Sequence, residues 1–84
     1  MGGLTEMANI GVKLEEQLVA VGIMSPKELI AVGSREAWLR IKKTTPSARI
    51  MLLLALEGAV RGIRWRDLDE QTKNQLKLFY QNTK

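Results

Sequence analysis

Eighty-four residues suit one compact domain, and a 45% share of hydrophobic residues is ordinary for a folded chain. Cysteine and histidine are both absent, which excludes disulfides, thiolate or imidazole metal sites and Ser-His or Cys-His catalytic dyads. We therefore expect a single non-enzymatic domain over residues 1–84 that needs no metal or cofactor. Its ordered part should run from about residue 7 to residue 82, with residues 1–6 flexible.

The net charge of +4 is unevenly distributed along the chain. Residues 1–34 carry a net charge of −2 and residues 67–84 a net charge of zero, so the basic character is central. Residues 35–66 carry a net charge of +6, with Arg35, Arg40, Lys42, Lys43, Arg49, Arg61, Arg64 and Arg66 against Glu36 and Glu57.

A membrane location is not expected. The longest apolar run, residues 50–56, is far shorter than the ~20 residues that a membrane span needs. The N-terminus also lacks the basic region and apolar core of a signal peptide. We expect a cytoplasmic protein.

The first predicted helix covers about residues 11–21. Leu14, Leu18 and Val21 recur at the spacing of one helical face, and Gly22 should end the helix. A second, short helix follows in the stretch SPKEL and stops near Gly33.

The start of this second helix carries a complete set of capping signals. Ser25 can act as the cap, Pro26 suits the first helical position, and Glu28 stands where a capping box requires it. The third predicted helix opens with Ser34 as its cap and pairs Glu36 with Arg40. Its inward side chains should be Ala37, Trp38 and Ile41.

The fourth predicted helix is the longest and the most apolar. Thr45 should cap it, Pro46 should lie in its first turn, and Gly62 should close it. Because residues 50–56 are apolar on nearly all sides, we expect the other helices to wrap around this one. Glu57 should pair with Arg61, and a small-residue side that another backbone can approach is formed by Ala55, Gly58, Ala59 and Gly62.

A fifth helix is predicted at about residues 69–81, burying Leu76, Phe79 and Tyr80. Strand-like alternation is nowhere sustained along the chain. The fold class is therefore all-α, a compact bundle of about five short helices with short loops.

The segment MANIG, residues 7–11, has the layout of a helix-hairpin-helix turn. Asn9 tolerates a left-handed conformation, Ile10 would plug the core, and Gly11 would let a phosphate approach a helix start near Lys13. These residues, Asn9, Ile10, Gly11 and Lys13, are the candidate phosphate contacts of the hairpin.

An acidic pair opposes this interpretation of the turn. Glu15 and Glu16 follow closely, and nonspecific DNA affinity depends on cations that replace counterions. We therefore favour a purely structural turn between packed helices, with the phosphate site as the alternative.

The basic centre is a stronger electrostatic candidate for contact with nucleic acid. Its candidate surface residues are Arg40, Lys42, Lys43, Arg61, Arg64 and Arg66. Trp65 lies between two of these arginines, where an aromatic ring can stack on bases, but a core plug is the interpretation that we favour. Leu39 falls on the predicted polar face of the third helix and is a candidate anchor for a protein partner.

Three blocks of the sequence, NIGVKLEEQLVAVGI, VGSREAWLRI and LEGAVRGIRWRDL, together resemble the C-terminal domain of the bacterial TfoX/Sxy competence regulators. The resemblance runs from about Met7 to Phe79 and keeps the order and spacing of the blocks. Ala8 replaces the proline that family members often have before the turn. Full regulators carry a further N-terminal domain, for which 84 residues leave no room, so we expect a stand-alone form.

The resemblance implies a helical domain with helix-hairpin-helix-like, or SAM-like, topology. It also implies a role near transcription or competence, because the full regulators promote expression of DNA-uptake genes together with a cyclic-AMP receptor protein. We expect a regulatory interaction module that binds a protein partner. The alternative is a weak, sequence-nonspecific DNA-binding domain.

Overall fold

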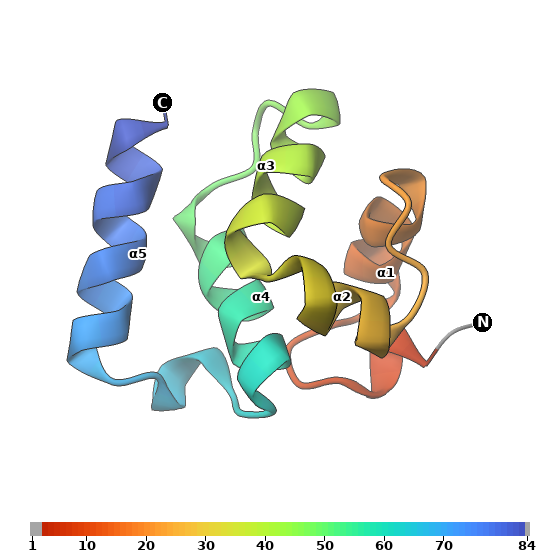
Figure 1. The fold of residues 1–84 in the computed structure, drawn as a ribbon, viewed down its shortest axis with the longest axis horizontal. Helices are drawn as coiled ribbons and strands as arrows, with labels where there is room; N and C mark the ends of the chain where they lie inside the picture. The colour runs from red at the N-terminus through yellow and green to blue at the C-terminus, as the bar shows by residue number, and fades with distance from the viewer. Residues whose placement is uncertain (1–2, 84) are drawn as a thin grey trace.

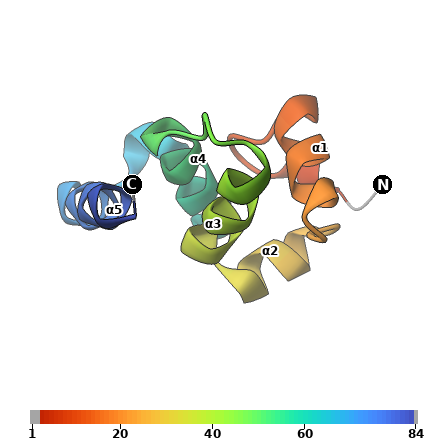
Figure 2. The same ribbon diagram turned by 90° about the horizontal axis from the view of Figure 1, so that it is seen from above.

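Helix α4, Ile50–Arg61, forms the centre of the fold, as its apolar sequence predicts. In the computed structural model, which describes residues 3–83, α3 (Ser34–Thr44) runs beside α4 in the middle of the molecule (Figure 1). Helix α5 (Glu70–Asn82) flanks α4 on one side. Helices α1 (Val12–Ala20) and α2 (Pro26–Val32) occupy the opposite end of the molecule (Figure 2).

Two short 3₁₀ helices complete the described part of the chain. Helix η1 covers Leu4–Glu6 and η2 covers Trp65–Asp67. Residues 3–83 contain no strand, so the predicted all-α class is confirmed. No helix within these residues is long and apolar enough to cross a membrane.

All five α-helices contribute buried apolar side chains to the core, and α3 and α4 contribute the most. Trp38, which was predicted to point inward, is fully buried, and so is Leu53 of the central helix α4. The largest completely buried side chains are Trp38, Leu4, Leu18, Ile23, Leu29, Ile41, Leu53, Leu56 and Leu76. Removing this apolar area from water is the main stabilising contribution to a domain of this size.

Local capping signals predicted most of the helix boundaries. The Ser25 hydroxyl accepts a hydrogen bond from the Glu28 N–H (3.2 Å), and Pro26 is the first residue of α2. The Glu28 carboxylate reaches back to the Met24 N–H (3.2 Å). The expected ends of the first and fifth helices are also correct to within about a residue.

The predicted start of the fourth helix is wrong. Thr45 is the C-terminal cap of α3, and its N–H donates to the Ile41 carbonyl. Helix α4 begins only at Ile50. Pro46 instead lies in a turn that is closed by a hydrogen bond from the Ala48 N–H to the Thr45 carbonyl (2.9 Å). Proline suits the second position of a β-turn as well as the first position of a helix, so this signal was ambiguous.

The predicted cap of the third helix is also wrong. Gly33, at φ 88°, precedes α3, and Ser34 is the first helical residue with no capping hydrogen bond from its side chain. The buried Ser34 hydroxyl donates to the Glu57 carboxylate instead (2.5 Å).

Three expectations about burial need correction. Leu4 is fully buried in η1, so the fold already includes Gly3–Glu6, which we had expected to be flexible. Phe79 and Tyr80 are only partly buried, because α5 lies at the edge of the bundle. Leu39 is partly buried and packs against the core, so its predicted place on a polar face is wrong, and with it the exposure expected of a partner anchor.

Candidate nucleic-acid interface at the Asn-Ile-Gly turn

The turn before α1 has the backbone geometry that its sequence predicts. Asn9 adopts the left-handed conformation (φ 70°), and Ile10 is buried in the core. Gly11 caps α1 from an extended conformation, and a Cβ added there would meet nothing within 4 Å. Lys13 is exposed in the first turn of α1. The surface at this helix start is therefore open.

The Asn9 side chain does not point at this open surface. Its amide N–H groups donate to the carbonyls of Ala55 (3.3 Å) and Ile63 (3.0 Å). Its carbonyl oxygen accepts from the N–H of Trp65 (3.1 Å). This set of three hydrogen bonds, which we call the Asn9 clamp, ties the turn to the last turns of α4 and to η2. An anion at this turn would thus meet the Asn9 backbone rather than its amide.

Gly58 makes room for the Asn9 clamp. A Cβ at this position would collide with the Asn9 amide nitrogen and would lie only 2.7 Å from the Ile63 carbonyl oxygen. It would also lie 3.1 Å from the Trp65 nitrogen. The prediction that a small-residue side of the fourth helix admits a second backbone is confirmed at this position. Sequence reasoning found the glycine and the asparagine but did not connect them.

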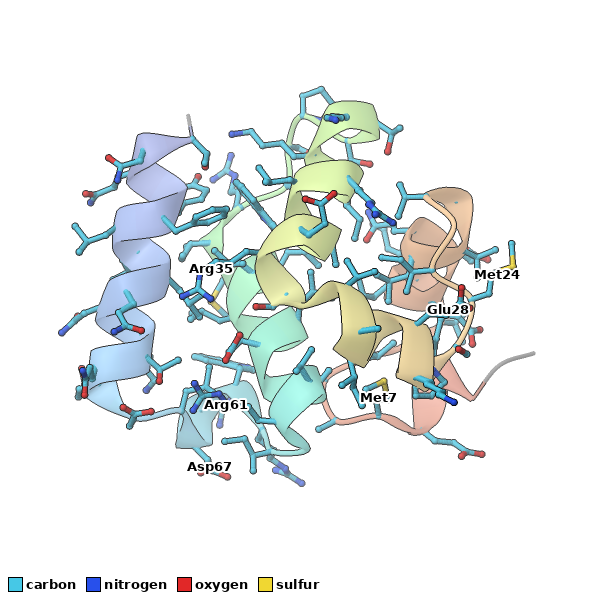
Figure 3. All side chains as sticks on the ribbon, viewed as in Figure 1. Met7, Met24, Glu28, Arg35, Arg61 and Asp67 are labelled. Carbon is cyan, nitrogen blue, oxygen red and sulfur yellow. The ribbon has the colours of Figure 1, made fainter. Side chains whose placement is uncertain are left out.

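A cleft opens where the clamp joins the turn to η2. It has a volume of about 490 Å³ and is lined by Ala8, Asn9, Arg64, Trp65 and Arg66. We call it the arginine cleft. The Arg66 guanidinium carbon lies 5.6 Å from the centroid of the Trp65 ring, within cation–π range. Figure 3 labels Arg61 and Asp67, which flank this segment at the lower end of the molecule.

Trp65 has two environments. Part of the side chain packs against the hydrophobic core, as a core plug would. Another part lines the arginine cleft. The expected role as a core plug is therefore incomplete, because the half-buried Trp65 also lines the cleft.

The six basic residues of the predicted surface do not form one patch. The upper basic group, Arg40, Lys42 and Lys43, lies at the C-terminal end of α3. The lower basic group, Arg61, Arg64 and Arg66, lies at and after the C-terminal end of α4, at the opposite end of the molecule (Figure 1). The six side chains therefore form two separate groups, and contact of either group with nucleic acid stays a prediction.

Two members of the upper basic group, Arg40 and Lys42, make contacts within the protein. Arg40 pairs with Glu36 at 3.0 Å, as predicted. The Lys42 ammonium donates to the Thr83 carbonyl (3.1 Å) and lies 4.9 Å from the centroid of the Trp38 ring. The Lys42 contacts join α3 to the C-terminal end of α5, whereas the Arg40 pair lies within α3.

The lower basic group is divided between a paired and two unpaired arginines. The Arg61 guanidinium lies 2.6 Å from the Glu57 carboxylate and 3.7 Å from that of Asp69. Within residues 3–83, Arg64 and Arg66 have no carboxylate within 4.0 Å. Two unpaired charges thus lie at the arginine cleft, and of the upper basic group only the exposed Lys43 makes no ion pair, hydrogen bond or cation–π contact within residues 3–83.

Glu57 is the buried acid that holds Arg61. Burial raises the pKa of its carboxyl group, but hydrogen bonds from Ser34 and Arg61 and the charge of Arg61 outweigh burial, so the pKa lies below its usual 4.5. Glu57 is therefore ionised at neutral pH. Its contacts make it a structural ion-pair partner rather than a proton donor or acceptor for chemistry.

The described residues hold no group of three or more acidic side chains that would suit a metal ion. The arrangement at the turn offers cationic groups, an aromatic ring and backbone N–H groups. Such a set can bind a phosphate or a planar anion.

Comparison with known proteins identifies the relatives of this chain. The family described as the TfoX C-terminal domain matches residues 1–80. Two crystal structures from Listeria monocytogenes, a triclinic form of an uncharacterized protein and a tetragonal form of a protein of unknown function, are each 51% identical to it. Both have a TM-score of 0.94. The matches cover 95% of this chain and 91% of the first, and 96% of this chain and 99% of the second. Among proteins of curated function, none matches this chain.

Proposed function

This chain belongs to the TfoX C-terminal domain family, and from that premise we propose that it is a non-enzymatic regulatory module that binds a protein partner in transcription or competence. The observation that carries the proposal is an exposed apolar surface on α1, α2 and the loop between them. We call it the α1–α2 surface and define it by Val12, Val19, Met24 and Ile30.

Four of the six large apolar side chains that are exposed in residues 3–83 belong to the α1–α2 surface, and the other two, Met51 and Leu78, lie on α4 and α5. Val12 is 67% exposed, Met24 55%, Ile30 54% and Val19 43%. Helices α1 and α2 both lie at the end of the molecule away from α5 (Figure 2). Exposed apolar side chains that gather at one end of a small domain are typical of a surface that a partner covers.

The charge around this surface indicates the chemistry of the partner. Glu15, Glu16 and Glu28 outnumber Lys13 and Lys27 on the two helices. We therefore propose a partner with an apolar centre and a basic rim, since complementary charges accelerate association and exclude wrong partners.

The proposal is tested by capture of partners from the native cells with immobilised protein, with and without nuclease. A Val19→Lys, Ile30→Lys double variant should lose the partner by at least about ten-fold, because it places two charges in the apolar interface. Met51→Lys, Leu78→Lys is the matched control, since it adds the same two charges at exposed apolar residues (49% and 60%) on α4 and α5. Retention by the double variant, or release of the partner by nuclease, would count against the proposal.

The arginine cleft favours a second candidate function, sequence-nonspecific binding of nucleic acid. Arg64 and Arg66 present charge beside the open start of α1, and neither reads a base by itself. Such binding should be weak, on the order of 10⁻⁴ to 10⁻⁶ M at physiological salt, and should weaken steeply as salt rises. A salt titration of the Arg64→Gln variant against the Lys43→Gln variant tests which end of the molecule is used.

A further inference from the structure

We propose that the arginine cleft takes an unpaired nucleotide of a single-stranded nucleic acid, with Trp65 and Arg66 against the base and Arg64 on a phosphate. This inference rests on the second candidate function above and names its substrate class. It is independent of the α1–α2 surface.

The dimensions of the arginine cleft suit one nucleotide. Its volume of about 490 Å³ falls within the roughly 300 to 1,000 Å³ of typical small-ligand sites. A base stacked within a duplex cannot enter such a cleft without leaving the stack, which costs a few kcal/mol. A single strand has no such cost, so the cleft favours unpaired bases.

The chemistry of the lining residues suits a base and its phosphate. Trp65 presents a half-buried ring, and the Arg66 guanidinium already stands over that ring at 5.6 Å. Indole rings and guanidinium planes are the two kinds of surface on which unpaired bases stack. Arg64 lines the same cleft, is exposed and has no carboxylate partner within residues 3–83, so its charge is available to a phosphate.

The Asn9 clamp holds this platform in place before any ligand arrives. The Trp65 N–H is bound to the Asn9 side chain, and the Ile63 carbonyl just before the cleft residues is bound to the same amide. Gly58 lets the Asn9 turn and the backbone of residues 63–65 both approach α4. The backbone of residues 63–65 is therefore fixed between α4 and the Asn9 side chain. A pre-ordered stacking ring loses less entropy on binding than a mobile one. Asn9 is thus a positioning residue for the cleft.

An acidic neighbour limits the expected affinity. Asp67 ends η2 and is exposed close to the two cleft arginines, so it partly offsets their charge. The protein should therefore bind single strands by a combination of stacking and charge, and not by charge alone.

The first experiment measures binding of a fluorescein-labelled oligothymidylate to the full chain at low salt by anisotropy. The same strand paired with its complement and free thymidine monophosphate are the two comparison ligands. We expect the single strand to bind at least about ten-fold more tightly than either. Equal affinity for the duplex would overturn the inference while leaving nucleic-acid binding intact. Equal affinity for the free nucleotide would show a mononucleotide site instead, and no binding of any ligand would remove both proposals.

Four variants locate the site. Trp65→Leu should weaken single-strand binding by about ten-fold, whereas Trp65→Phe, which keeps an aromatic ring, should retain most of it. Arg64→Gln should lower the slope of log affinity against log salt by about 0.7, the contribution of one phosphate contact. Lys43→Gln, which removes one charge from the upper basic group, is the matched control and should change the slope least.

Tryptophan fluorescence of the unmodified protein provides a measurement that does not depend on any variant folding. Trp38 is fully buried, so quenching by the oligothymidylate reports on Trp65. We expect quenching that saturates with the anisotropy change. Unchanged fluorescence at saturating strand, or wild-type affinity in both Arg64→Gln and Trp65→Leu, would overturn the inference even if Trp65→Leu melts at a lower temperature.

Discussion

The two basic groups carry similar charge in the sequence but serve different purposes in the fold. In the upper basic group, Lys42 bridges Trp38 and the end of α5, and Arg40 pairs with a neighbouring glutamate. In the lower basic group, only Arg61 is paired, and Arg64 and Arg66 line a cleft. The difference arises from aromatic packing at one end and from the Asn9 clamp at the other. Charge density along a chain therefore does not indicate which charges are available to a ligand.

The largest effect should come from breaking the aromatic packing at the upper end. Trp38 is fully buried, its ring contacts Phe79 and Tyr80 edge-on, and its N–H donates to the Arg49 carbonyl (3.2 Å). Trp38→Ala should lower the free energy of unfolding by about 3 to 5 kcal/mol, which is a large share of the stability of a small domain. Urea denaturation followed by circular dichroism measures this. A loss below about 1 kcal/mol would mean that α5 is not held to the bundle through Trp38.

Breaking the Asn9 clamp should destabilise the protein less than Trp38→Ala does. The effect should be mainly at the end of the molecule that holds the lower basic group. Asn9→Ala removes three hydrogen bonds, leaves the Ile63 carbonyl without this partner, and puts alanine in a left-handed conformation. We expect a loss of about 2 kcal/mol in the free energy of unfolding. Asn9→Gly is the control, because it removes the same hydrogen bonds but tolerates the left-handed backbone angle, so it should lose less than alanine.

Gly58→Ala tests the same clamp from the side of α4. Alanine in a helix interior normally stabilises by up to about 1 kcal/mol relative to glycine, but here its Cβ would collide with Asn9 and with the Ile63 carbonyl. The expected net result is a loss of about 1 to 2 kcal/mol. In an Asn9→Ala background the loss should shrink, because one of the colliding groups is gone. Purely additive losses in the double variant would show that the two residues do not interact.

The ion pair between Arg61 and Glu57 predicts that the stability of the fold depends on pH. The pKa of Glu57 lies below its usual value, so its ionised form stabilises the fold above about pH 4.5, and this stabilisation is lost as the pH falls through the folded-state pKa. The melting temperature should therefore fall more steeply below pH 4.5 in the unmodified protein than in Glu57→Gln. Asp69, whose pKa is lowered by hydrogen bonds from Thr72, is present in both proteins and cancels in the comparison. If the melting temperatures of the two proteins fell in parallel from pH 7 to pH 3, Glu57 would not be the stabilising ionised group.

Short-range signals explain how much of the fold the sequence predicted. The Ser25 cap, Pro26 and Glu28 of α2 were predicted from the sequence, since these residues lie within one helical turn, although Glu28 accepts from the Met24 N–H and not from that of Ser25. The central place of α4 followed from its apolar composition. The start of α4 was missed, because Pro46 satisfies a turn and a helix start equally well and only the packing of Ala48 and Trp38 decides between them.

Long-range contacts explain why the sequence predicted individual residues of the candidate site but not how they come together. Asn9, Ile10 and Gly11 have the conformations expected of the turn, but the partners of Asn9 lie 46 to 56 residues away along the chain. The Ser34–Glu57 hydrogen bond spans 23 residues. No periodicity or spacing rule reaches across such separations. A glycine in the middle of an apolar helix, together with an asparagine at a turn, is the one local pattern that hinted at the contact.

The smallest predicted effects are those of neutralising one cation in each basic group, and they compare the two groups most directly. Lys42→Gln removes a cation that lies over Trp38 and donates to the Thr83 carbonyl, so it should lower the free energy of unfolding by about 0.5 to 1 kcal/mol. Arg64→Gln removes an exposed cation without a carboxylate partner within residues 3–83, so unfolding should change by less than about 0.5 kcal/mol.

Both variants lose one positive charge, so any difference between them reflects contacts and not net charge. Equilibrium urea denaturation at two salt concentrations resolves the comparison, because screening weakens exposed interactions more than partly buried ones. A destabilisation in Arg64→Gln that equals the one in Lys42→Gln would mean that Arg64 serves the fold as Lys42 does. In that case the arginine cleft would be a structural feature, and the charge of Arg64 would not be available to a ligand.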